Sequence, residues 1–519
     1  MIDIFAGPGG LGEGFSSFAP TRGSHWHPFE LIVSAEAERS AHATLRLRSF
    51  SRILGLHGEE ATADYFSYLG LLRATTLSPE AAFSSGRWQK EWQQAGAEAL
   101  NLTLGQRADN SLLIERIKAA RARYDELILI GGPPCQAYSL VGRARQRNVR
   151  GFRSKGDHRH FLYREYLELL AEFTPAVFIM ENVKGILTST VGGEELFSAI
   201  RNDLADPSMA LGRSRQQSIA GRQYVLLPIH VNPGEKRTPD LVQSDPGRFV
   251  IRAERHGIPQ ARHRVIIMGV RADCLKPSVE FVEGLSIVDR PPHVGQALAG
   301  LPTLRSALSR QPDIPEAWNE AVLDECDRVA RIVEASHPEV RRVLREVRPR
   351  VDRPRRSHGY TSASSQLASE LRDGRQNIVL NHESRTHMKP DLGRYLFCAA
   401  FAEVYERSPK SKDFPKRLAP SHENWESGDF RDRFRVQLKG KPSSTITSHL
   451  SKDGHAFIHW DPTQCRSFTV REAARLQTFP DDYLFIGNRT QQYVQVGNAV
   501  PPMLAGQIAR VVWDVLRAT

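Results

Sequence analysis

The chain has 519 residues, too many for one simple hydrophobic core, so two or more domains are expected. Lys and Arg number 70 against 59 Asp and Glu, and the formal net charge of +11 favours a polyanionic partner such as nucleic acid. No apolar run approaches the roughly 18 residues of a membrane helix, and the N-terminus runs straight into a predicted strand, so neither a membrane span nor a signal peptide is expected.

The five cysteines, at positions 135, 274, 326, 398 and 465, form neither a disulfide framework nor a Cys-x-x-Cys metal spacing. We therefore expect a protein of a reducing compartment, the cytoplasm, that holds no metal ion. A metal site built from His382 and His387 is the alternative that the sequence offers.

The first predicted element is a buried strand over residues 1–5 that runs into a glycine-rich loop. Glycines at 7, 9 and 10 let the chain turn tightly, and their missing side chains let backbone donors approach a ligand. Glycines at 7, 9 and 12 also fit the Gly-x-Gly-x-x-Gly order of NAD-dependent dehydrogenases, which is the rival interpretation of this loop. Glu36, at the end of the second predicted strand, is placed like an acidic residue that holds a ribose.

Two further strands predict an α/β fold. After a long connection at about 49–123, where Trp88, Trp92, Leu100 and Leu104 suggest helices, residues 127–130 form a buried strand that stops at Gly-Gly-Pro-Pro-Cys, 131–135. Residues 176–180 form another, which leads into Glu-Asn-Val at 181–183. Because the carboxyl ends of parallel strands meet at one edge, the glycine loop, a cysteine and a carboxylate should come together. The arginine-rich stretch from Ser139 to His160 predicts a phosphate-binding loop.

The second half of the chain is more polar and basic. Gln-Ala-Arg-His-Arg stands at 260–264, and a predicted helix from Pro315 to Val347 leads into an arginine run that ends at Arg356. Two stretches rich in Asn, His and Arg follow at 381–387 and 431–435, and these residue types suit base edges and phosphates. Thr469 and Glu472 form a capping-box pattern, which predicts a helix that ends before Pro480.

In this order, the glycine loop, the cysteine turn, Glu-Asn-Val, Gln-Ala-Arg-His-Arg and the segments 469–481 and 495–502 resemble the motif set of the DNA (cytosine-5) methyltransferases. The resemblance covers residues 1 to about 48, about 125–190, about 248–305 and about 441–515. It implies a Rossmann-like S-adenosylmethionine methyltransferase sheet with a second, smaller target-recognition domain. The catalytic domain would span 1–305 with a helical insertion at about 49–123, the target-recognition domain 306–440, and residues 441–519 would return to the catalytic domain.

The resemblance also implies roles at the catalytic centre. Cys135 would add as a thiolate to carbon 6 of cytosine, which activates carbon 5. Glu181 would contact ring N3 as an acid and bond the exocyclic amine. Arg262 and Arg264, alternating on a strand, would face the same way and hold the flipped base and its backbone. The alternatives are an inert buried cysteine, a Glu181 carboxylate that caps a helix or pairs with an arginine or with the nearby Lys184, and arginines that only make salt bridges.

The implied cofactor is S-adenosylmethionine. The ring of Phe5 would stack on its adenine, the glycine loop would hold its amino-acid end, and Glu36 would take its ribose hydroxyls. The acidic residue expected near the adenine amine is hard to place, and Asp64 is the candidate. The implied cofactor contacts are Phe5, Gly7, Gly9, Gly10, Glu36, Asp64, Pro134 and Asn498.

The implied activity is methylation of carbon 5 of a flipped cytosine in a specific short sequence of double-stranded DNA. A monomer within a restriction-modification or related defence system, with a cognate endonuclease, is the implied setting. Two alternatives stay open: a transfer-RNA cytosine-5 methyltransferase of the same family, and a catalytically silent DNA-binding protein. The sequence lacks the Cys-Phe-Thr tripeptide characteristic of the first and shows none of the damaged catalytic positions that the second would have.

Overall fold

The computed structural model describes residues 1–518 except 22, 25, 125, 135–161, 192–193, 214–222 and 421–432. Cys135, the predicted phosphate-binding loop up to His160, Arg431 and Asp432 therefore lie outside the described residues.

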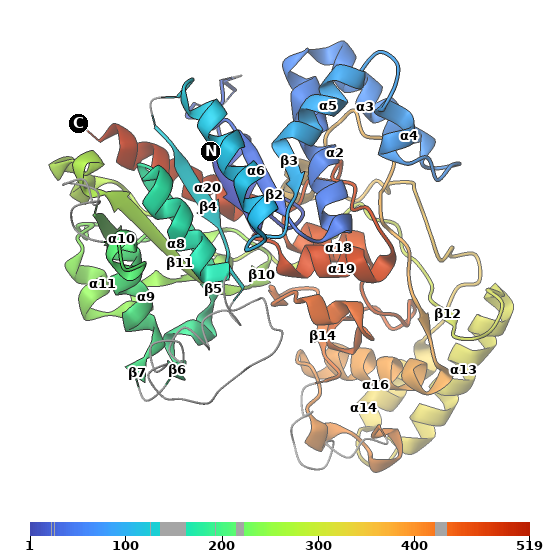
Figure 1. Cartoon of the computed structure of the whole chain (residues 1–519). Coiled ribbons are helices and arrows are strands. Elements are labelled where there is room, and N and C mark those ends of the chain that lie inside the picture. Colours follow the sequence, from blue (N-terminus) through green and yellow to red (C-terminus); the bar gives the residue numbers. More distant parts are fainter. Residues whose placement is uncertain are drawn as a thin grey trace, which may run out of the picture.

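A mixed sheet organises the N-terminal half of the chain (Figure 1). Its strand order is β3-β2-β1-β4-β5-β11-β8, with β9 paired to β11. The strands are β1 (Ile2–Ile4), β2 (Val33–Glu36), β3 (Ala99–Asn101), β4 (Ile128–Gly131), β5 (Val177–Val183), β8 (Tyr224–Leu227), β9 (Val250–Arg252) and β11 (His263–Arg271). The first five in that order are parallel, whereas β11 runs antiparallel to its three neighbours. The predicted α/β class is confirmed.

β4 and the first part of β5 are buried on both faces, which explains their unbroken apolar runs. In β5, Phe178 and Met180 pack into one hydrophobic layer, while Val177 and Ile179 pack into the opposite one. The first layer is covered by α6 (Arg107–Arg121), α8 (Leu162–Phe173) and α9 (Leu196–Ala205). The second is covered by α1 (Gly10–Ser16) and α20 (Pro502–Arg517), which pack against each other.

The long connection before β4 contains a short strand as well as helices. It holds the end of α2 (Arg39–Leu56), then α3 (Glu59–Leu71), α4 (Pro79–Phe83), α5 (Gln89–Glu98), the strand β3 and α6. The helical expectation holds for Trp92, which lies in α5, but it was wrong for Leu100 and Leu104. Leu100 lies in the edge strand β3 and Leu104 in the turn after it, because a three-residue strand is too short for its alternation to stand out in the sequence.

The second region is mainly helical and is built on α13 (Pro315–Ile332), α14 (Pro338–Glu346) and α16 (Lys389–Tyr405). The single helix predicted from Pro315 to Val347 is in fact two, since Pro338 is the first residue of α14 and cannot continue α13. Two short parallel strand pairs complete this region: β12 (Ala307–Leu308) with β13 (Thr386–His387), and β14 (Val436–Gln437) with β16 (Ile458–His459).

The C-terminal helices α18 (Val470–Leu476) and α19 (Arg489–Asn498) lie between the sheet and the helical region (Figure 1). The predicted capping box at the start of α18 is confirmed, because the Thr469 side chain accepts from the Glu472 amide and the Glu472 carboxylate accepts from the Thr469 amide. The chain then returns to the glycine loop: a Cβ on Gly10 would lie 2.3 Å from the Val500 carbonyl oxygen.

Candidate active site

The carboxyl ends of β1, β2, β4 and β5 meet at one edge of the sheet. Their register aligns Ile4 with Ala35 and Gly131, and Gly131 with Met180. The next residues on the four strands are Phe5, Glu36, Gly132 and Glu181. The chain order reverses between β1 and β4, and ligands of such sheets bind at this kind of crossing.

The loop after β1 turns through unusual backbone conformations. Phe5 has a φ of 57°, in the left-handed region that a bulky residue rarely enters, and Gly7 and Gly9 follow at 58° and 98°. A Cβ on Gly7 would meet no atom of the described residues within 4 Å, so none of them covers this side of the turn. Strained backbone of this kind gathers at ligand sites.

Glu36 closes the turn from the neighbouring strand. Its carboxylate accepts hydrogen bonds from the Gly7 and Glu38 amides, each at 2.8 Å. Burial raises the pKa of the Glu36 carboxyl, although both amide bonds work against that rise. The residue is therefore anchored to the glycine loop at the same edge.

Asp64 lies elsewhere. It is on α3, which packs on α2, and its carboxylate accepts a hydrogen bond from Trp88 Nε1 at 2.8 Å. The residue that β3 brings beside Glu36 is Asn101, whose side-chain amide donates to the Glu36 backbone carbonyl at 2.9 Å. Sequence reasoning missed Asn101 because β3 was not recognised as a strand.

Glu181 stands at the end of β5 against the turn that follows β4. Its Oε1 lies 2.9 Å from Arg264 Nε, and both side chains are about 15% exposed. A Cβ on Gly132 would come within 3.2 Å of Glu181 Oε2, so a larger residue there would press on the carboxylate. The carboxylate is thus paired with an arginine, as the alternative interpretation expected, but the partner is Arg264 and not Lys184.

Asn182 ties the ends of β4 and β5 together. Its side-chain amide donates to the Pro133 carbonyl at 2.9 Å. The next residue, Pro134, is half-buried, and Cys135 follows it outside the described residues. The Asn of the Glu-Asn-Val segment therefore fixes the turn that leads to the cysteine.

Arg262 occupies the one-residue break between β10 (Gln260–Ala261) and β11. It is 2% exposed and donates to the carbonyls of Ile446 and Gly497 at 2.9 and 3.2 Å. Burial and the nearby Arg264 lower the pKa of Arg262 to about 9, against the opposing effect of Glu181. Its Nε is buried and has no hydrogen-bond partner among the described residues.

The stretch 381–387, predicted to suit base edges, is instead largely buried. His382 uses both ring nitrogens, on Thr469 Oγ1 and the Pro302 carbonyl, and Arg385 donates to the Leu450 carbonyl. Within the described ranges there is also no group of three or more His, Cys, Asp and Glu side chains that could hold a metal ion. These side chains fasten the second region to the C-terminal segment.

Much of the basic run before residue 357 is neutralised by nearby acids. Arg341 pairs with Glu334, Arg350 with Asp352 and Arg355 with Glu383.

Asn498, expected at the cofactor site, lies at the end of α19 and is exposed. No helix in the part of the chain that the structure describes is long and apolar enough to cross a membrane.

The free energy of unfolding should depend on pH through Asp3, which is buried in β1 beneath the glycine loop. Burial and the neighbouring Glu36 raise the pKa of its carboxyl to about 8. Because the folded state holds this proton more tightly than the unfolded chain, the group contributes stability below about pH 4 that is lost as the pH rises to about 8. Between about pH 5 and about pH 7, this loss lowers the free energy of unfolding by up to about 1.4 kcal/mol per pH unit, and Asp3→Asn should remove it. Urea unfolding at several pH values, on wild type and variant, measures the slope. An unchanged pH slope would contradict the assignment.

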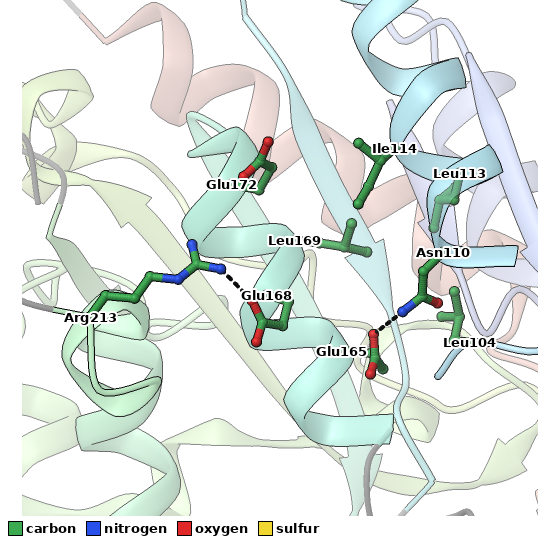
Figure 2. A pocket seen from close by; sticks show the side chains of 9 residues that line it. All are labelled: Leu104, Asn110, Leu113, Ile114, Glu165, Glu168, Leu169, Glu172 and Arg213. Carbon is green, nitrogen blue, oxygen red and sulfur yellow. Dashed lines mark hydrogen bonds and ion pairs between the residues drawn. The ribbon is translucent and has the colours of Figure 1, made fainter. Parts of the chain in front are cut away.

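A separate cavity of about 250 Å³ lies between α6 and α8 (Figure 2). Leu104, Leu113, Ile114 and Leu169 form its apolar part, and three α8 glutamates stand around it. Each glutamate already has a partner: Asn110 for Glu165, Arg213 for Glu168 and Lys118 for Glu172. We assign it no ligand.

The doubly wound sheet, the glycine turn held by Glu36, and the Glu181 carboxylate at the same edge are the features of a Rossmann-like α/β fold that binds its ligand at the carboxyl ends of the strands. Residues 61–207 and 249–513 match the family model described as C-5 cytosine-specific DNA methylase. The chain belongs to this family.

Its relatives cover most of the chain. It is 31% identical over 530 residues to the type II methyltransferase M.Bpa9945I of Bacillus paralicheniformis, covering 99% of both proteins. It is 28% identical to the type II methyltransferase M.AgeI of Thalassovita gelatinovora, over 74% of this chain and 82% of that protein. The DNA (cytosine-5-)-methyltransferase M.ApeKI of Aeropyrum pernix is 27% identical, over 76% of this chain and 82% of its own length.

Proposed function

We propose that the protein transfers a methyl group from S-adenosylmethionine to carbon 5 of a cytosine flipped out of a specific short sequence in double-stranded DNA, through an adduct between Cys135 and carbon 6. The observation that carries the proposal is the Glu181–Arg264 pair packed against Gly132, beside the Pro133–Pro134 turn that leads to Cys135. This is the edge of the sheet at which ligands of the fold bind.

The state of the other cysteines supports Cys135 as the nucleophile. Burial raises the pKa of the Cys274 thiol to about 11 and of Cys326 to about 12, and holds Cys398 and Cys465 well above their usual range. All four are therefore held as thiols at neutral pH, and a thiolate is the reactive form. Cys135 is the remaining cysteine, and it follows the turn at the functional edge.

The surrounding side chains suit an attack on carbon 6. As the Cys135 thiolate adds there, negative charge develops on the ring; Glu181 in its protonated form gives its proton to N3, which neutralises the ring, and Glu181 is left as a carboxylate. That carboxylate has Arg264 as its ion-pair partner, at 2.9 Å. Arg262 is a buried cation whose Nε has no hydrogen-bond partner in the described part of the chain, so it favours an anionic group close by, as a DNA phosphate or the charged ring would be. A base must leave the duplex to reach these groups.

The residues of the glycine turn fit S-adenosylmethionine, which when bound supplies an electrophilic methyl group. The open side of Gly7 can admit the amino-acid end, the Glu36 carboxylate can accept from ribose hydroxyls, and Phe5 can stack on the adenine. Asn101 is better placed than Asp64 to approach the adenine amine, since it contacts Glu36. Gly9, Gly10, Pro134 and Asn498 complete the proposed set.

We propose a role in restriction-modification, which the type II names of the relatives support, and we propose a cognate endonuclease as partner and the cytoplasm as the place of action. We propose a monomer acting on one strand at a time.

The first experiment incubates the protein with labelled S-adenosylmethionine and either unmethylated genomic DNA or transfer RNA, then sequences the DNA for 5-methylcytosine. Label in DNA at one recurrent short motif is the expected result and identifies the target sequence. Label only in transfer RNA would replace the proposed substrate. Label in neither would contradict methyl transfer by this chain alone.

A further inference from the structure

The glycine loop is held from behind by side chains that the proposed mechanism does not use. Arg48 of α2 donates from Nε and Nη2 to the two carboxylate oxygens of Glu13, at 2.8 and 2.6 Å. Its Nη1 donates to Asp482 at 2.7 Å. Glu13 lies in the first turn of α1, the helix that continues the glycine loop. One guanidinium therefore joins that helix to the segment after α18.

Tyr483 holds the middle of the loop. Its hydroxyl donates to the Pro8 carbonyl, and a Cβ on Gly9 would lie 3.0 Å from the same hydroxyl. The Arg48 guanidinium lies 5.0 Å from the centre of its ring, so the two side chains form one unit. Tyr483 is 1% exposed, and a buried carbonyl that loses its donor is costly.

These contacts lie on the packed side of the loop, whereas on the ligand side none of the described residues would meet a Cβ at Gly7. Together with the bond from the Gly7 amide to Glu36, Arg48 and Tyr483 therefore hold the turn in position before any ligand arrives. If loss of either contact lets the loop relax, only a fraction of the molecules keeps the loop in the shape that binds the donor. The apparent affinity for the donor is then the intrinsic affinity multiplied by that fraction.

We propose that Arg48 and Tyr483 are positioning residues for the methyl donor: they hold the glycine turn in the shape that binds its amino-acid end, without contacting it. The inference rests on the proposed use of S-adenosylmethionine and names what prepares the site for it. If the inference is right, removing either contact should weaken donor binding by more than removing a comparable buried contact away from the loop, even when both changes lower the stability equally.

A pair of tyrosine variants separates positioning from stability. Tyr68 of α3 is 4% exposed and also donates its hydroxyl to a backbone carbonyl, that of Leu77, at 3.1 Å, away from the glycine loop. Tyr483→Phe and Tyr68→Phe thus remove the same atom from two buried sites, and the midpoint of thermal unfolding should shift by similar amounts. Calorimetry with S-adenosylhomocysteine should show about tenfold weaker binding for Tyr483→Phe and a change of no more than about twofold for Tyr68→Phe.

A pair of arginine variants tests the second residue. Lysine keeps the charge but cannot reproduce the three-nitrogen fork of Arg48. Arg46, two residues earlier on α2, pairs with Glu80 at 2.9 Å and stacks on Trp92, and does not contact the loop. Arg48→Lys should weaken S-adenosylhomocysteine binding and raise KM for the donor, with kcat at saturating donor and duplex affinity near wild type. Arg46→Lys should leave all four unchanged.

Two outcomes would overturn the inference. Unaltered donor affinity in both Tyr483→Phe and Arg48→Lys would show that the loop keeps its shape without them. Equal losses in the matched controls would assign the effects to general stability. Wild-type protein that binds no S-adenosylhomocysteine would instead overturn the proposed function, so the two failures are distinguishable.

Discussion

Replacing Cys135 with serine should abolish methyl transfer while donor binding stays within about twofold of wild type. A hydroxyl is far harder to deprotonate than a thiol, so the nucleophile that adds to carbon 6 is lost, and the rate should fall by at least about a thousandfold. The proposed donor contacts on the glycine loop and Glu36 lie on other strands and are untouched. Initial rates with labelled donor on duplex DNA and calorimetry with S-adenosylhomocysteine measure the two effects.

Cys274→Ser is the matched control. Cys274 is only partly buried, and its side chain contacts Arg271 near the end of β11, so the same substitution there should leave the rate near wild type. Methylation that persists in Cys135→Ser would rule out a covalent mechanism through this residue, whatever the control shows.

The sheet was predictable where strands are buried on both faces. The runs that became β4 and β5 are short, apolar and followed by glycine and proline or by a carboxylate, because each crosses the core and ends at the functional edge. β1 is equally short, and its two isoleucines flank Asp3. The capping box of α18 was equally readable, since it depends on two residues three apart. Local patterns sufficed for these elements.

Elements and contacts that depend on distant partners were not predictable. β3 spans three residues and is a strand because β2 pairs with it. The residues of 381–387 resemble a base-reading stretch, yet their partners, such as Thr469 and Leu450, lie more than 60 residues further along the chain. The partner of Glu181 was also missed, because the antiparallel pairing of β5 with β11 brings Arg264 to it.

Glu181→Gln should lower the methylation rate by about a hundredfold to ten-thousandfold with little change in duplex affinity. Glutamine has nearly the same shape, so the packing against Gly132 and the contact with Arg264 can persist. It has no proton to transfer to ring N3, so the charge that develops on cytosine is no longer relieved. Single-turnover rates and duplex binding, measured on the same preparations, give the two numbers.

Glu254→Gln is the control for this variant. Glu254 is also partly buried, and its carboxylate lies 2.8 Å from the Nε2 of His263, with which it makes a hydrogen bond; His263 is the residue directly before Arg264 in β11. Because its carboxylate belongs to a different pair, its loss should leave both rate and duplex affinity close to wild type. If Glu181→Gln lowered rate and duplex affinity equally, Glu181 would be a structural partner of Arg264, and the acid at ring N3 would have to come from another residue.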